Sequence, residues 1–76
     1  MKYIIFNFDN IEVPIMFSGH LIHSEVAGLI GRPVVSAGFV SVNADRTLTG
    51  YGESISLGVK SRPEDSVILT KAKERV

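Results

Sequence analysis

The segment that decides the fold is KYIIFNFDNIEVPIMF, residues 2–17. Two sets of side chains alternate along its first half: Ile4, Phe6 and Phe8 on one face, then Tyr3, Ile5 and Asn7 on the other. Asp9 and Asn10 are typical turn residues, and apolar residues then recur at every second position of 11–17. We therefore expect an antiparallel hairpin. Pro14 lacks an amide hydrogen, which predicts that the second strand is an edge strand or is unpaired there.

Helix and turn signals divide the segment that follows the hairpin. Ser24 is the expected N-cap of a short helix, which Gly31 and Pro33 end. The β-branched, apolar run 34–42 predicts a strand, with Gly38 as the expected position of a bulge. Residues 43–46 have the composition of a turn, and residues 47–51 are expected to return as the neighbouring strand.

The run YGESISLGV, residues 51–59, is the next informative stretch. Gly50 and Gly52 permit a bend, and the alternation after them predicts a strand over residues 54–59. Two faces follow from this register: Ile55, Leu57 and Val59 toward the core, and Ser54, Ser56 and Gly58 away from it. Side chains this small allow another backbone, subunit or ligand to approach closely. The face is either a docking surface or an ordinary solvated sheet face.

The last segment predicts a helix. Ser61 and Glu64 have the spacing of a capping box, although Pro63 restricts Arg62 and makes Arg62 an alternative cap. Glu64 and Asp65 suit the positive end of the helix dipole. The apolar stripe is Ile68, Leu69, Ala72 and Val76, and the basic residues of the last turns are Lys71, Lys73 and Arg75. The expected order is β-β-α-β-β-β-α, an α+β domain with an antiparallel sheet, one short helix and a C-terminal helix.

Composition limits the class of protein. Seventy-six residues predict a single domain, 1–76, and no Cys is present to form a disulfide or a thiolate metal site. Because 45% of the residues are hydrophobic in so small a chain, we expect a second copy or a partner to cover apolar surface. The formal net charge is zero, which is not typical of a nucleic-acid-binding protein. No signal segment or membrane span is expected, so we predict a cytoplasmic protein.

Three motifs invite a catalytic, metal-binding or anion-binding interpretation. Residues 52–56 resemble a G-x-S-x-G nucleophile elbow, but the last position is Ser, and a chain this short cannot build the large parallel sheet that the elbow requires. His20, His23 and Glu25 lie close in sequence, but their spacing matches no established zinc motif, so we expect no metal and no cofactor. Lys60 and Arg62 precede a helix N-terminus that could hold an anion, but the acidic residues Glu64 and Asp65 occupy the same end.

Four segments together carry a resemblance to a known group of proteins. They are His23-Ser24-Glu25-Val26-Ala27, Pro33 to Phe39, Tyr51 to Gly58, and Ser61-Arg62-Pro63-Glu64-Asp65. In this combination the chain resembles small uncharacterised proteins encoded by bacteriophages and prophages, over nearly its whole length. The resemblance implies a compact accessory protein of a mobile element. Proteins of that setting often bind and block a host component, including CRISPR and other defence complexes.

The sequence therefore predicts a phage-type accessory protein that is not an enzyme and that acts by protein–protein binding, with a homo-oligomer and a host protein as the expected partners. The candidate binding residues are Ser54, Ser56, Gly58, Lys60 and Arg62. The alternative is an oligomeric small-molecule or nucleotide-binding protein, with its ligand between subunits near the Ser/Gly face. An enzyme ranks below both, because no acid–base or nucleophile constellation is visible.

Overall fold

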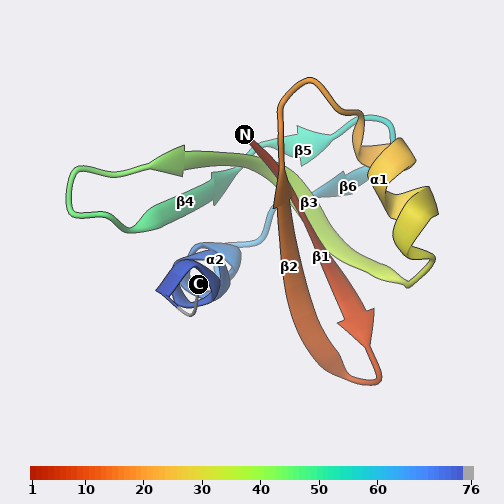
Figure 1. The fold of residues 1–76 in the computed structure, drawn as a ribbon, viewed down its shortest axis with the longest axis horizontal. Helices are drawn as coiled ribbons and strands as arrows, with labels where there is room; N and C mark the ends of the chain where they lie inside the picture. The colour runs from red at the N-terminus through yellow and green to blue at the C-terminus, as the bar shows by residue number, and fades with distance from the viewer. Residues whose placement is uncertain (75–76) are drawn as a thin grey trace.

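A computed structural model describes residues 1–74, and Arg75 and Val76 of the predicted C-terminal helix lie outside the described residues. The elements are β1 (Lys2–Phe8), β2 (Ile11–Phe17), α1 (His23–Ile30), β3 (Val34–Val42), β4 (Leu48–Tyr51), β5 (Glu53–Ser54), β6 (Val59–Lys60) and α2 (Asp65–Glu74). A four-stranded antiparallel sheet has the order β2-β1-β3-β4, and β5 and β6 form a separate small hairpin (Figure 1). The predicted α+β class, with one short helix and a C-terminal helix, is confirmed.

Strand β1 lies inside the sheet and is buried on both faces. Tyr3 and Ile5 pack with Leu69 of α2 on one face, and Ile4 and Phe6 pack with the α1 side on the other. All four β1 side chains of this run are fully enclosed. The sheet therefore has α2 on one side and α1 with the β5–β6 hairpin on the other (Figure 1). This three-layer arrangement accounts for much of the apolar composition within one chain.

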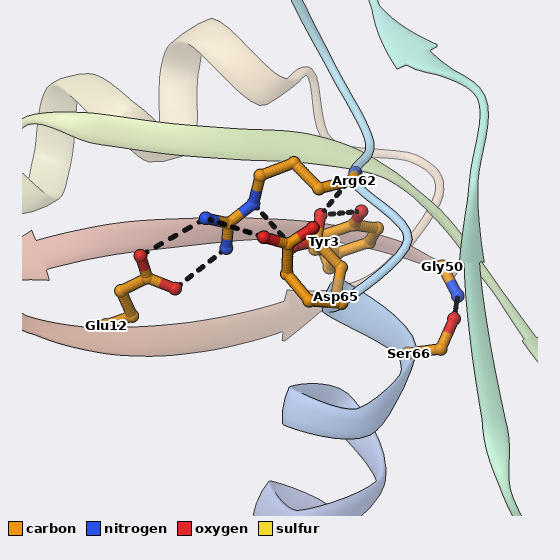
Figure 2. Close-up of polar contacts among 7 residues, drawn as sticks. Tyr3, Glu12, Gly50, Arg62, Asp65 and Ser66 are labelled. Carbon is orange, nitrogen blue, oxygen red and sulfur yellow. Dashed lines mark hydrogen bonds and ion pairs between the residues drawn. The ribbon is translucent and has the colours of Figure 1, made fainter.

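The β1–β2 hairpin has the predicted turn. Phe8 pairs with Ile11, and Asp9 and Asn10 both have positive φ, 52° and 70°, as a two-residue type I′ turn requires. Strand β2 is an edge strand, as Pro14 predicts. The other edge, β4, is covered by α2 (Figure 2). The amide of Gly50 donates to the hydroxyl of Ser66 at 3.0 Å, as Figure 2 shows. The amide of Leu48 likewise donates to the hydroxyl of Thr70, at 2.9 Å. These bonds occupy amides that would otherwise be open to strand pairing.

Two local predictions in the middle of the chain are wrong. Helix α1 begins at His23 with Ile22 as its N-cap, so Ser24 lies within the first turn and does not cap it. The β-bulge lies where the pairing shifts between Ile5 and Phe6 of β1, and not at Gly38, which pairs regularly with Tyr3. Gly38 is required for another reason, because an added Cβ would collide with the carbonyl oxygen of Tyr51. The predicted helix stop at Gly31, which has φ 70°, is confirmed.

The predicted continuous strand over residues 54–59 is also wrong. A turn over residues 55–58 separates β5 from β6, because the Ser54 hydroxyl accepts the amide of Leu57 and Gly58 takes a left-handed φ of 68°. The predicted faces are therefore mixed. Ser54 is buried, whereas Ile55 is 89% exposed. Among the described residues, no helix is long and apolar enough to cross a membrane.

Helix α2 begins at Asp65, and a turn that starts at Arg62 and contains Pro63 leads into it. The backbone amide of Arg62 donates to Asp65 Oδ2 at 2.9 Å, and the amide of Asp65 donates to the carbonyl of Arg62 at 3.0 Å, so the Asp65 side chain closes this turn. Within the described part of the helix the predicted apolar stripe faces the sheet, with Leu69 fully enclosed and Ile68 and Ala72 half-buried.

Candidate functional site

The five predicted binding residues do not share one surface. Ser54 is buried, Gly58 lies in the β5–β6 turn, and Lys60 is exposed on β6. Ser56 is exposed and lies at the margin of a groove, while Arg62 belongs to an ion-pair network under α2. The outward Ser/Gly face that grouped these residues is absent from this structure, because its strand is a turn. Their binding role stays a prediction, and it now divides between two places.

Figure 2 shows the network around Arg62. Its Nε donates to Asp65 Oδ1 at 2.9 Å, and its two terminal nitrogens donate to the carboxylate of Glu12 at 2.8 and 3.2 Å. Tyr3 donates its hydroxyl to Asp65 Oδ2 at 2.6 Å. Asp65 is fully enclosed, whereas the side chains of Arg62 and Glu12 keep 26% and 38% of their surface exposed. The network therefore links the β1–β2 hairpin to the start of α2.

The pKa values in this network favour the charged forms of the acids and of the arginine. Burial raises the pKa of Asp65, but the hydrogen bonds from Tyr3, from the Arg62 amide and from the Arg62 side chain outweigh it and hold that pKa below its usual value. Burial and the neighbouring carboxylate together raise the pKa of Tyr3. The hydrogen bond from Arg62 lowers the pKa of Glu12, and the same bond raises the pKa of Arg62.

This arrangement opposes the anion-binding interpretation of Arg62. Its guanidinium is matched by two carboxylates, and Glu64 approaches it as well, at 3.9 Å. A guanidinium paired in this way offers little net charge to a phosphate. Asp65 has no accessible surface, and the partly exposed carboxylate of Glu12 is paired with the guanidinium of Arg62. The network therefore has a structural role, because it joins the β1–β2 hairpin to the start of α2. We refer to its four residues, Tyr3, Glu12, Arg62 and Asp65, as the latch.

The second place is a groove of about 580 Å³ on the opposite side of the sheet from α2. It lies where the end of β4, the start of α1 and the β5–β6 hairpin meet. Its lining residues are Lys2, Ile22, His23, Phe39, Tyr51, Gly52, Glu53, Ile55 and Ser56. We refer to these nine residues as the β4–α1 groove. Of the predicted binding residues, only Ser56 is among them.

Aromatic rings form the floor of the β4–α1 groove. The rings of His23 and Phe39 meet edge to face with centroids 5.9 Å apart, and Phe39 lies 5.9 Å from Tyr51 at a tilt of 33°. Phe17 closes the other side of the imidazole at 5.5 Å. Gly52 has a φ of 76° and lies against Phe39, which brings β5 back over these rings. Edge-to-face packing of this kind fixes ring positions.

Exposed apolar side chains surround this floor. Ile22 and Tyr51 are about half exposed, at 49% and 50%, and Ile55 is 89% exposed at the tip of the β5–β6 turn. The rim also has two charged residues, Lys2 and Glu53. The ammonium of Lys2 donates to the backbone carbonyl of Leu21 at 2.7 Å. The groove is therefore mainly an apolar and aromatic surface.

Ser56 ties two walls of the groove together. The backbone amide of Ser24, in the first turn of α1, donates to the Ser56 hydroxyl at 3.2 Å. The first amides of a helix lack partners within the helix, and the N-cap residue Ile22 has no side-chain acceptor to offer. Ser56 thus supplies from the β5–β6 turn what an N-cap side chain normally supplies locally.

The candidate metal ligands have separate environments. His20 is exposed in the loop before α1, whereas His23 is buried and its Nε2 is bonded to the carbonyl of Gly38. Within residues 1–74, no three of the His, Cys, Asp and Glu side chains are grouped as a metal site would require.

Comparison of the chain with family models, with curated proteins and with solved structures found no match.

Proposed function

We propose that this protein is a small, non-enzymatic binding protein that docks another protein in the β4–α1 groove. The observation that carries the proposal is the gathering of exposed Ile22, Tyr51 and Ile55 around a hollow with a rigid aromatic floor. Isolated exposed apolar residues are ordinary, but a contiguous set rimmed by polar residues is typical of an interaction surface. A rigid aromatic such as Tyr51 is also typical of the residues that dominate binding energy.

The charges of the molecule support binding over catalysis. The fully enclosed Asp65, whose pKa is lowered by its hydrogen bonds, belongs to the network on the other side of the sheet and is out of reach of a substrate. In the groove, Lys2 is bonded to a backbone carbonyl and His23 to another. A general acid–base pair needs two groups facing one reacting atom, and this arrangement does not supply them.

The proposal takes a host protein as the partner, as the resemblance to phage-encoded proteins implies, with a component of a defence complex such as CRISPR as the specific case. It places this binding in the cytoplasm, since a chain without Cys suits a reducing compartment. A second candidate is a small-molecule or nucleotide carrier, which the groove volume of about 580 Å³ favours because ligand pockets commonly fall between about 300 and 1,000 Å³.

Two matched arginine substitutions test the docking site. Ile55→Arg places a charge at the tip of the groove, and Leu29→Arg places the same charge near the other end of α1, where Leu29 is 87% exposed. Both side chains reach water, so we expect both variants to fold with unchanged circular dichroism. With tagged protein in host lysate, we expect Ile55→Arg to lose the captured partner and Leu29→Arg to keep it. Equal capture by the two variants would contradict the groove as the docking site.

Native mass spectrometry of the same captures separates the two candidate functions. A retained host subunit supports docking, and its mass identifies the partner. A retained small molecule, with no protein partner in either variant, would instead favour the carrier.

A further inference from the structure

The β2 edge of the four-stranded sheet lacks the cover that closes the β4 edge. Two hydroxyls of α2 accept the outward amides of β4, whereas β2 has β1 as its one neighbouring strand. An edge strand presents unpaired amides and carbonyls to any chain that can align with them. What can pair with β2 therefore depends on which of its backbone groups point outward.

The hydrogen bonds of β1 and of Met1, just before it, determine this direction. The amide of Asn7 donates to the carbonyl of Pro33, in front of β3. The carbonyl of Met1 likewise accepts from the amide of Val40 in β3. The backbone groups of successive residues point to opposite sides of a strand, so the odd residues of β1 face β3 and its even residues face β2.

Three residues of β2 therefore turn their backbone groups to the open edge. The even residues of β1 pair with Ile11, Val13, Ile15 and Phe17, which leaves Glu12, Pro14 and Met16 outward. The amides of Glu12 and Met16 have no acceptor in residues 1–74. Pro14, between them, has no amide hydrogen, and its ring fills the place where a neighbouring strand would put a carbonyl.

Pro14 is the one protection of this edge among the described residues. Natural sheets also protect an edge by a short strand, a bulge or an unpaired charge. Strand β2 has seven residues, and its register with β1 has no shift. Its one charged side chain, Glu12, is paired with Arg62 at 2.8 Å. Without Pro14 the edge would be long, regular and apolar, which is typical of an edge that pairs with another chain.

The sequence of β2 fits the same strand of a second copy. An antiparallel pairing about a two-fold axis at Pro14 sets Glu12 opposite Met16 of the second copy, so both free amides meet carbonyls. On the α1 side of the sheet, the half-buried Val13 lies opposite Ile15 of the second copy, and β-branched side chains pair favourably across strands. The centre alone fails, because each Pro14 ring meets the carbonyl of the other.

We propose that Pro14 prevents the β2 edge from pairing with the β2 edge of a second copy, in a two-fold arrangement centred on that residue. The inference does not depend on the β4–α1 groove, and it goes beyond the proposed function. With β4 closed by α2 and β2 closed by Pro14, neither edge of the sheet accepts a strand. A partner then binds through side-chain surfaces and not by strand addition.

Amide hydrogen exchange, followed by nuclear magnetic resonance on the purified 76-residue protein, tests this inference. In the wild type, we expect the amides of Glu12 and Met16 to exchange freely and those of Val13 and Ile15, bonded to β1, to be protected. Pro14→Val restores the missing donor with a residue that favours strands. We expect this variant to sediment as a dimer. Exchange at Glu12 and Met16 should slow about tenfold when about nine tenths of the chains are paired, since exchange then requires the free copy, and dilution should reverse it.

Pro14→Lys is the matched control. It restores the same amide, but the two-fold axis would set two ammonium groups directly opposite each other, and like charges in that position oppose pairing. We therefore expect Glu12 and Met16 to exchange freely in this variant. Should Pro14→Val fail to fold, Pro14→Thr restores the amide with another β-branched side chain, and the same dimer is expected.

Any of the following results would overturn the inference: protected Glu12 and Met16 amides in the wild type, unchanged exchange and mass in the folded valine or threonine variant, or equal pairing in Pro14→Lys and Pro14→Val. A wild-type oligomer whose Glu12 and Met16 amides exchange freely supports it, because that oligomer uses another surface. The captures with Ile55→Arg bear on the groove alone, so failure of the proposed function is a separate result.

Discussion

Replacing Tyr3 by Phe removes one hydroxyl from the centre of the molecule and leaves the ring in place. This hydroxyl is fully enclosed and donates to the Asp65 carboxylate at 2.6 Å (Figure 2). A hydrogen bond to a charged group contributes about 1.5–3 kcal/mol to the free energy of unfolding. Asp65 keeps the amide and Nε of Arg62 as donors, so its charge is not left unpaired. We therefore expect Tyr3→Phe to cost about 2 kcal/mol.

A loss of this size is measurable in so small a domain. At roughly 0.05–0.15 kcal/mol per residue, a chain of this length has a total stability of about 4–11 kcal/mol. A loss of about 2 kcal/mol should lower the thermal midpoint by about 8–16 °C and the urea midpoint by about 1–2 M. Circular dichroism follows both transitions. Tyr51→Phe is the control, because Tyr51 is half exposed and its hydroxyl has no partner in residues 1–74.

A double-mutant cycle tests the reasoning behind this number. If the Tyr3 hydroxyl acts through Asp65, Tyr3→Phe must cost much less in an Asp65→Asn background than in the wild type. Equal costs in both backgrounds would show that the hydroxyl stabilises the fold in some other way. A midpoint change no larger than that of Tyr51→Phe would refute the latch itself.

Four further predictions concern acid stability, packing, metal and assembly. Burial raises the pKa of Asp65, but its hydrogen bonds hold that pKa below the value of about 3.9 in an unfolded chain. As the pH falls, the unfolded state therefore takes up the proton first, and the urea midpoint should fall below about pH 4. Asp65→Asn should make the urea midpoint less dependent on pH in this range. Gly38→Ala should cost about 1–3 kcal/mol or more in urea unfolding, since its Cβ meets the Tyr51 carbonyl, whereas Gly19→Ala has open space and should cost little. EDTA should leave the thermal midpoint unchanged, and a loss that Zn²⁺ restores would contradict this. Sedimentation at micromolar concentration should show a species heavier than 8.3 kDa, and a monomer throughout a hundredfold dilution would contradict self-association.

The features that the sequence predicted correctly depend on neighbouring residues. The alternation in residues 2–8, the turn at Asp9 and Asn10, and the helix stop at Gly31 each follow from side-chain period or from positive φ, which act over a few residues. Pro14 at an edge follows from the missing amide hydrogen alone. These local rules were enough to define the α+β class and the order of the elements.

The error over residues 54–59 also has a local cause. The alternation there covers only six residues. The same sequence is also compatible with a tight hairpin in which the Ser54 hydroxyl accepts a hydrogen bond from the Leu57 amide. A serine that bonds to nearby backbone competes with strand geometry, and Gly58 makes the left-handed turn inexpensive. Two glycines within seven residues, Gly52 and Gly58, were the signal that favoured a turn over a strand.

The latch and the groove could not be predicted in this way, because their members are far apart in the sequence. Arg62 and Glu12 are separated by 50 positions, and Tyr3 and Asp65 by 62. No period or cap relates such residues before the strand order is known. The groove has the same origin, since Ile22, Phe39 and Tyr51 meet only once α1 and β4 take their places beside β3. One sequence signal was available: Leu21 and Ile22 are apolar, precede the helix, and belong to no predicted core face.

Ser56 has a different physical role in the structure from the one that the sequence predicted. Its prediction as a binding residue assumed a flat face of small side chains, but in the structure its hydroxyl holds the Ser24 amide at the start of α1. Ile55 is the residue before Ser56, and His23 is the residue before Ser24, so one hydrogen bond joins the exposed tip of the groove to its floor. A partner that contacts Ile55 therefore contacts the same β5–β6 turn whose hydrogen bond to the Ser24 amide helps to position His23. Because this hydrogen bond couples the two, we expect Ser56→Ala to weaken binding and also to shift the ring resonances of His23 in the free protein, whereas weaker binding with the His23 ring resonances unchanged would assign Ser56 to direct contact with the partner.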